Sequence, residues 1–231
     1  MKTTIVAGIL QPSYLSWIPF FKRMYMSDVF IYLDDVQYSK NSFHNRNRIK
    51  TFKGSLTLTV PVLYKGNSSK TIADMPINNS INWQRKHFKA IEQNYKKAKY
   101  FGQITTILIE KIYSKTWERL GDLNINIIEL FKNYLEINTK CYRSSEILVK
   151  GQGNEKLVNL CHRFNAKEFI VKPGTQHYHP EKFFKKNDIN FKYFTIDPIP
   201  YSQLYGEFIH GLSILDYVMN CGSDNSYFQR I

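Results

Sequence analysis

A strand, a helix and a second strand follow one another near the N-terminal end of the chain, and this pattern constrains the fold most. Residues 3–10 form a short apolar run that ends at a proline, which cannot continue a strand. Apolar side chains then recur at near-helical spacing over residues 16–26, and residues 29–33 are an unbroken β-branched and aromatic run. Continuously apolar strands joined through a helix are typical of parallel pairs covered on both faces, with a right-handed crossover. The sequence therefore predicts an α/β fold built on a mostly parallel sheet.

The rest of the chain divides into a helical middle and a C-terminal return to alternating strands and helices. Residues 56–62 alternate in polarity as an edge strand does, and the pattern is helical from about residue 83 to 135. Further on, Asn154 can cap a helix that precedes a strand at 168–171, and a second helix leads to a strand at 191–196. We therefore expect a Rossmann-like sheet flanked by helices, with a helical insertion or cap in the middle of the chain.

The size and composition of the chain fit one globular domain. With 231 residues, 43% of them apolar, it can bury a sizeable core without disulfide or metal staples, so we expect a single domain, residues 1–231. No run approaches the ~20 apolar residues of a membrane-spanning helix, and the first ten residues indicate a buried strand rather than a signal peptide. The three cysteines lack the spacing of a zinc or redox motif, which indicates free thiols in a reducing compartment. These features predict a cytoplasmic protein.

The chain is strongly basic. Thirty-two Lys and Arg against 19 Asp and Glu give a formal net charge of +13, and the resulting positive field attracts phosphates, nucleic acid or an acidic membrane face. The alternative interpretation is that the Lys-rich and Asn-rich composition reflects an AT-rich genome, with many lysines on solvated helix faces.

Polar side chains are densest directly after the second predicted strand, where ligands gather in parallel sheets. The cluster contains Asp34, Asp35, Gln37, Lys40, His44, Asn45, Arg46, Asn47 and Arg48. His44, Asp34 and Asp35 are candidates for general acid–base catalysis, and the other members are candidates for substrate binding. Arg46 and Arg48 are candidates for phosphate or carboxylate contacts, because a guanidinium fork binds oxyanions bidentately. The alternative interpretation is a solvated loop with Asx turns.

A second cluster follows the first predicted strand. Tyr14 and Trp17 can stack on a planar or sugar ring, while Gln11 can donate and accept hydrogen bonds. The alternative interpretation places both rings in the core. Because the carboxyl ends of parallel strands meet at one edge of a sheet, we expect this cluster and the polar cluster to face a common pocket.

The remaining polar residues are weaker candidates for catalysis or metal binding. His177 and His179 lie two residues apart without a third ligand, so no metal site is predicted. Cys161 lies on the apolar stripe of its helix, which favours a core position over a nucleophile. Asp216 can either reach the site or cap a helix, and the sequence does not separate these two roles.

These motifs together resemble the WbqC-like family. They are QPSYLSWIPFF, SDVFIYLDDVQYSK and HNRNRIK within residues 11–50, followed by LTVPV, the region of Tyr178 and FIHGLSILDYVMNCG. The resemblance covers essentially the whole chain and adds Tyr178 to the candidates for substrate binding. Ser16 stands where the family has a proline and Pro19 where it has a glycine, so the loop there is expected to differ.

The resemblance implies a role in the synthesis of O-antigen and other surface polysaccharides. It implies a transferase that moves glycine or a related aminoacyl group onto an amino sugar, which we expect to be nucleotide-linked. His44 or Asp34 would deprotonate the sugar amine, and Arg46 and Arg48 would hold the diphosphate. The cofactor is unknown, with an aminoacyl-tRNA or ATP as candidates, and the high positive charge suits a tRNA partner.

Two other functions remain open. The opening strand, loop, helix and acidic strand end are similar to those of Rossmann-like nucleotidyl-transferases that activate acids with ATP, with Tyr14 and Trp17 where those enzymes have paired histidines. A non-catalytic module that binds a nucleotide sugar or RNA is the second alternative. Fold analogy does not decide between them.

Overall fold

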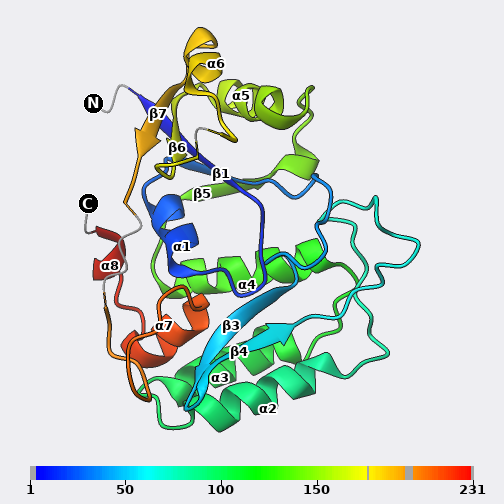
Figure 1. The fold of residues 1–231 in the computed structure, drawn as a ribbon, viewed down its shortest axis with the longest axis vertical. Coiled ribbons are helices and arrows are strands. Elements are labelled where there is room, and N and C mark those ends of the chain that lie inside the picture. The colour runs from blue at the N-terminus through cyan, green and yellow to red at the C-terminus, as the bar shows by residue number, and fades with distance from the viewer. Residues whose placement is uncertain (1–3, 176, 196–199, 230–231) are drawn as a thin grey trace.

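The centre of the protein is a twisted parallel sheet, seen in a computed structural model that describes residues 4–175, 177–195 and 200–229 (Figure 1). Over these residues, five strands form one sheet in the order β5-β2-β1-β6-β7, and every neighbouring pair is parallel. The strands are β1 (Ile5–Leu10), β2 (Val29–Tyr32), β5 (Lys140–Arg143), β6 (Ala166–Val171) and β7 (Asn190–Tyr193). The predicted α/β, Rossmann-like fold is confirmed. Residues 3 and 196, at the ends of two predicted strands, lie outside the described residues.

Alternation along the central strands sends side chains to two separate cores. Phe30 and Tyr32 of β2 join a large core on one face, while Val29 and Ile31 join a smaller core on the other. Strand β1 lies between β2 and β6, and Ala7 pairs with Val29 on one side and Phe169 on the other. Burial on both faces explains why these strands carry continuous apolar runs.

Helices cover both faces of the sheet. Helices α5 (Gly153–Arg163) and α6 (Glu181–Lys186) contribute to the smaller core, whereas α1 (Ile18–Tyr25) and α4 (Leu120–Tyr134) contribute to the larger one (Figure 1). Helix α5 begins one residue before Asn154 and after Gln152, so Asn154 is not the cap that its position suggested.

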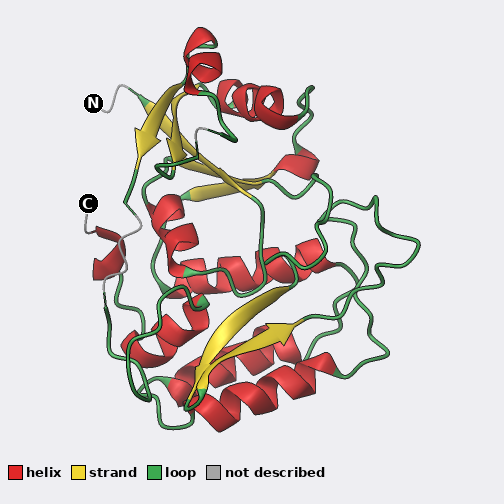
Figure 2. Ribbon diagram, viewed as in Figure 1, coloured by secondary structure: helices red, strands yellow, loops and turns green. Residues whose placement is uncertain are grey.

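A long segment between β2 and β5 adds a β-hairpin and further helices. The hairpin pairs β3 (Arg46–Thr51) with β4 (Gly54–Thr59) in an antiparallel sheet of its own, apart from the parallel sheet (Figure 2). The predicted helical middle contains α2 (Trp83–Tyr95), α3 (Phe101–Leu108), a π-helical turn (Ile109–Tyr113) and α4. The alternative interpretation of the polar cluster as a solvated loop does not hold from Arg46 onward, where β3 begins. A tight turn at Gly54, with φ of 119°, folds two polar-rich segments into a hairpin that local pattern alone does not reveal.

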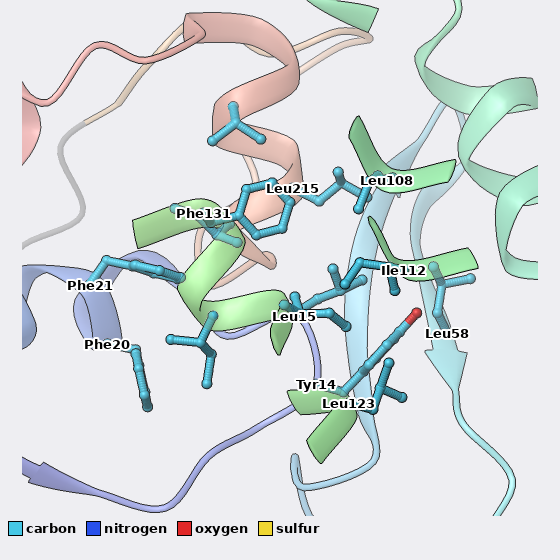
Figure 3. Close-up of a cluster of buried hydrophobic side chains, with 14 of the residues drawn as sticks. Tyr14, Leu15, Phe20, Phe21, Leu58, Leu108, Ile112, Leu123, Phe131 and Leu215 are labelled. Carbon is cyan, nitrogen blue, oxygen red and sulfur yellow. The ribbon is translucent and has the colours of Figure 1, made fainter. Parts of the chain in front are cut away.

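The larger core joins the sheet to this inserted segment. Tyr14, Phe21, Leu58, Leu123 and Leu215 come from separate parts of the chain and pack in one apolar cluster (Figure 3). The remaining elements are a 3₁₀ turn (Ser144–Glu146), α7 (Ile214–Cys221) and α8 (Ser226–Gln229). Over the described ranges, the helices are too short or too polar to cross a membrane.

Candidate functional site

The strand order turns at β1, and a cavity opens beside the end of that strand. The chain leaves β1 through α1 and pairs next with β2, while β6 takes the opposite side of β1. Open α/β sheets bind ligands outside the carboxyl ends of their strands at such a switch point. A cavity of about 390 Å³ lies here, lined by residues of β1, α1, α5 and β6 and by His44.

A second cavity adjoins the first. It has a volume of about 300 Å³ and is lined by Asn47, Arg48 and residues near His210. Ser13, Trp17 and Phe43 line both cavities. We call the two adjoining cavities the cleft, and together they have the size of small-molecule sites.

Gln11 and His44, one from each of the two predicted clusters, meet at the first cavity. His44 Nε2 lies 2.9 Å from Gln11 Oε1, and the Ser39 backbone N–H donates to His44 Nδ1 at 3.2 Å. Because a backbone N–H only donates, Nδ1 must accept, so the ring proton is on Nε2 and is donated to Gln11. Burial lowers the pKa of His44 to about 4, which keeps this ring neutral at physiological pH. The pair thus turns the Gln11 amide NH₂ away from His44.

His44 has both ring nitrogens engaged in this arrangement. Its role as a catalytic base stays a prediction, and these contacts do not supply the free lone pair that a base needs. What they supply is a fixed orientation for the Gln11 amide.

Trp17 stands between the two cavities at the start of α1. Its side chain is 39% exposed, although most of the surrounding segment is buried. An indole that is half-covered and borders an open space can stack on a planar ring or pack against a sugar. Trp17 therefore lines both cavities, and its role in stacking on a ligand stays a prediction.

Arg48 brings a positive charge to the second cavity. Its Nη2 donates to the Gly211 carbonyl at 3.2 Å, while its buried Nε has no hydrogen-bond partner among the described residues. Asn47 next to it donates to the Tyr14 and Leu15 carbonyls at 3.2 and 2.9 Å, which ties the hairpin to the loop after β1. The hairpin therefore positions Arg48 beside a segment more than 30 residues earlier in the chain.

Arg23 brings a second positive charge, to the first cavity, and was not among the predicted residues. Its Nε is buried without a partner in the described part of the chain, and its guanidinium lies 5.2 Å from the centre of the Phe194 ring. Burial lowers its pKa to about 10, so it stays charged at neutral pH. A signal existed in the sequence. Phe20 and Arg23 are three residues apart, which puts a charge on the apolar face of α1.

Asp34 and Asp35 face a different neighbourhood, where the side chains of β5 and the 3₁₀ turn enclose them. Asp34 is fully buried and accepts from Arg143 Nε at 2.8 Å and from the Ser145 backbone N–H and hydroxyl, both at 2.9 Å. Asp35 contacts Ser144 Oγ at 2.5 Å and pairs with Lys156. Neither carboxylate lines the cleft. This position does not support the catalytic role that the sequence suggested for them.

Tyr14 lies in the core rather than in the cleft. Its ring is fully buried (Figure 3), and its hydroxyl contacts His87 Nδ1 at 2.8 Å and the Tyr113 hydroxyl at 3.0 Å. His87 Nε2 donates to the Thr59 carbonyl at 3.2 Å, so Tyr14 donates to the other ring nitrogen. A ring that is fully buried and lines neither cavity cannot stack on a ligand in the cleft, which removes one of the two side chains behind the comparison with nucleotidyl-transferases.

The other predicted binding residues divide between structural contacts and open surface. Asn45 is buried and donates to the Val60 carbonyl at 2.7 Å, and Arg46 donates to the Asn41 carbonyl. Gln37 is exposed and donates to the Ser68 carbonyl at 3.0 Å, and Lys40 lies 5.2 Å from the centre of the Tyr64 ring. None of these four side chains lines the cleft.

The two predicted residues from the C-terminal third also lie away from the cleft. Tyr178 is 77% exposed and lines neither cavity. Asp216 is fully buried and accepts from the hydroxyls of Tyr95 and Tyr201, both at 2.7 Å. Burial raises the pKa of its carboxyl, while the two hydroxyl donors lower it. Asp216 therefore contributes to the core.

The cleft also contains Ser13, Phe43, His179 and His210, which the sequence did not single out as binding residues. They come from loops that lie far apart in the sequence, so no local pattern indicates that they border one cleft. Within the described ranges, no group of three His, Cys, Asp or Glu side chains is placed to hold a metal ion.

Comparison with known proteins agrees with this view of the chain. The model of the WbqC-like protein family matches residues 11–227. The chain is also 33% identical to "Uncharacterized protein Rv1507c" of Mycobacterium tuberculosis over 224 residues, which cover 96% of each protein. No solved structure matches. The matched region begins directly after β1 and includes the other elements around the cleft, and the chain belongs to the WbqC-like protein family.

Proposed function

We propose that the protein is a cytoplasmic transferase that N-acylates an amino sugar, by glycyl or aminoacyl transfer, during surface-polysaccharide synthesis. The acceptor we propose is a nucleotide-linked amino sugar bound in the cleft. One observation carries this proposal: two guanidinium groups without carboxylate partners among the described residues, Arg23 and Arg48, border one cleft on either side of Trp17.

The chemistry of the cleft suits such an acceptor. Leaving a guanidinium Nε buried and unpaired is costly, and an anionic ligand offsets that cost through charge-assisted hydrogen bonds. Trp17 offers a face for the base or the sugar ring, and the Gln11 NH₂ can donate to a hydroxyl or carbonyl. A nucleotide-linked sugar offers a partner for each group: a diphosphate for the guanidinium groups, and base and sugar rings for the indole face and the amide.

The acyl donor stays open between two classes. The net charge of +13 supports an aminoacyl-tRNA, since phosphate neutralisation dominates nucleic-acid affinity. ATP with a free amino acid is the alternative. The two donors differ in their products, because only the second releases a nucleotide.

The proposal is tested by product mass. We expect a nucleotide-linked amino sugar to gain the mass of one glycyl or aminoacyl group when it is incubated with the protein and a charged tRNA, or with ATP and the amino acid. No mass gain with any acceptor and donor pair would count against the transferase.

Arg48→Gln and Arg46→Gln form a matched pair for testing where the acceptor binds. Both arginines lie on β3, two residues apart, but only Arg48 lines the cleft. We expect Arg48→Gln to weaken binding of UDP, measured by calorimetry, about tenfold or more, because a hydrogen bond to a charged group contributes roughly 1.5–3 kcal/mol. Arg46→Gln should change the affinity less than twofold. Equal losses in both variants would mean that a general field, rather than the cleft, attracts the ligand.

A non-catalytic nucleotide-sugar binding module is the second candidate. The observation that favours it is that His44 has both ring nitrogens engaged and that Asp34 and Asp35 lie outside the cleft. A tight and specific complex without turnover for every donor class would select this candidate.

A further inference from the structure

We infer that His179 is the base of the cleft, the group whose Nε2 takes the proton from the attacking amine. This inference rests on the proposed transferase and names a residue for the proton transfer, for which the predicted candidates are poorly placed. His179 lies just before α6 and lines the first cavity together with Arg23 and Gln11.

The Asn154 side chain determines which nitrogen of His179 carries the proton. Asn154 Nδ2 donates to the Tyr178 carbonyl at 3.0 Å, so its Oδ1 is the atom that faces His179 Nδ1 at 2.9 Å. An amide oxygen only accepts, so Nδ1 must carry the ring proton. The lone pair is then on Nε2, for which the described residues provide no hydrogen-bond partner.

The surroundings of the ring keep it neutral and ready to accept a proton. Phe169 and Phe184 meet the imidazole edge to face, with ring centres 5.7 and 6.1 Å away. Burial between them lowers the pKa of His179, and the positive charge of Arg23 on α1 lowers it further. Across α1, α5, β6 and α6, Arg23 is the charged group that acts on this ring among the described residues. A neutral imidazole with a free lone pair is therefore present at pH 7.

His44 provides the contrast within the same cleft. Its proton is on Nε2 and its Nδ1 lone pair accepts from Ser39, so it has no free acceptor. The two histidines hold opposite tautomers, and only that of His179 leaves a lone pair for a substrate. Arg23 lines the same cavity as His179, so an anion bound at Arg23 places its attached sugar in the cavity that His179 borders.

The step balances with an aminoacyl ester as donor. The sugar nitrogen attacks the ester carbonyl carbon, a C–N bond forms, and the N–H proton passes to His179 Nε2. The C–O bond of the ester then breaks, and His179 returns the same proton to the departing hydroxyl oxygen. An amide and an alcohol leave, and the histidine is neutral again.

His179→Gln and His177→Gln form the matched pair for the kinetic test. His177 is exposed, two residues away in the same loop, and does not line the cleft. We expect His179→Gln to lower kcat by about 10²–10⁴ while the Kd for UDP changes less than threefold. His177→Gln should keep both values. Activity of His179→Gln within threefold of the wild type, or a parallel loss of UDP binding, would overturn the inference.

Asn154→Asp adds a readout that a purely structural role would not move. A carboxylate at Nδ1 raises the pKa of an imidazole, so the acid limb of the kcat profile should move to higher pH. An unmoved acid limb would contradict the assignment of that limb to His179.

A third measurement needs no substrate and separates this inference from the proposed function. Long-range ¹H–¹⁵N spectra of the ¹⁵N-histidine-labelled protein at pH 7, assigned by the signals missing in His179→Gln and His44→Gln, report each tautomer. We expect a protonated Nδ1 in His179 and a protonated Nε2 in His44. If the tautomers are as expected and no donor supports turnover, the transferase proposal fails. A charged or Nε2-protonated His179 would overturn the inference whatever the turnover.

Discussion

Two polar regions follow neighbouring strands of the same sheet, yet they differ in how fully their polar groups are paired. After β2, Asp34 is fully buried with both oxygens engaged by Arg143, Ser144 and Ser145. After β1, the cleft retains a guanidinium Nε of Arg23 with no partner among the described residues. Both regions lie close to a strand end, but they differ in whether their charged groups have hydrogen-bond partners.

The difference teaches which polar cluster can hold a ligand. A carboxylate with every lone pair occupied has no capacity left for a substrate, and its contacts stabilise the chain around it. A charged group that the chain leaves unpaired is stabilised only by water or by a ligand. The Asp34 network therefore stabilises the sheet edge, whereas the cleft retains the capacity to bind a ligand.

Removing Asp34 gives the largest expected effect. Asp34→Ala leaves Arg143 without its buried partner and the Ser145 backbone N–H and hydroxyl without their acceptor, so the free energy of unfolding should fall by roughly 3–5 kcal/mol in urea titrations. Asp74→Ala is the control, because its ion pair with Arg119 is exposed and contributes less than about 1 kcal/mol. If Asp34→Ala is as stable as the wild type but has lost turnover, the Asp34 network has a catalytic role and the comparison is wrong.

Acid provides the second test, because His44 is neutral in the folded cleft. Its pKa is lowered by burial from 6.5 to about 4, so the unfolded chain binds a proton that the folded chain does not between these values. Stability from this group is complete above about pH 6.5 and is lost as the pH falls towards 4, by up to about 3 kcal/mol.

His44→Gln should remove that part of the pH dependence. The quantity to compare is the fall in the free energy of unfolding between pH 6.5 and 4, which should be smaller in His44→Gln than in the wild type. His162→Gln, on the exposed side of α5, is the control for losing a histidine. An identical fall in all three proteins would mean that His44 is charged in the folded state.

The parallel sheet was predictable because its signals are local. The apolar runs of β1 and β2, and the turn residue that precedes β6, each lie within a few positions of the element that they define. Asn165, with φ of 54°, ends α5 in the left-handed conformation as its side chain predicts. Such signals need no knowledge of distant contacts.

The partition of the polar residues was not predictable, because it depends on contacts that span the chain. Asp34 meets Ser145 across 111 positions, and Arg48 meets Gly211 across 163. Arg48 lines the cleft and Arg46, two residues away on the same strand, does not. Nothing local separates these two arginines, so sequence could only name both.

Replacing Trp17 gives the smallest expected effect, and it tests whether the cleft after β1 binds a ligand. Trp17→Ala should weaken UDP binding about 5- to 150-fold, because losing the ring on which a base stacks costs roughly 1–3 kcal/mol. The loss in stability should be smaller than for a core aromatic, because the indole is 39% exposed. Phe52→Ala is the control, since Phe52 is 70% exposed at the hairpin turn, away from the cleft.

If Trp17→Ala binds UDP as well as the wild type and Arg48→Gln does not, the cleft recognises only the anionic part of the ligand. The Trp17 ring would then have a structural role beside that site, as the Tyr14 ring already has within the core. Loss of affinity in both variants, with Phe52→Ala unchanged, would mean that charge and stacking act on one ligand, which is the arrangement that a nucleotide-linked acceptor requires.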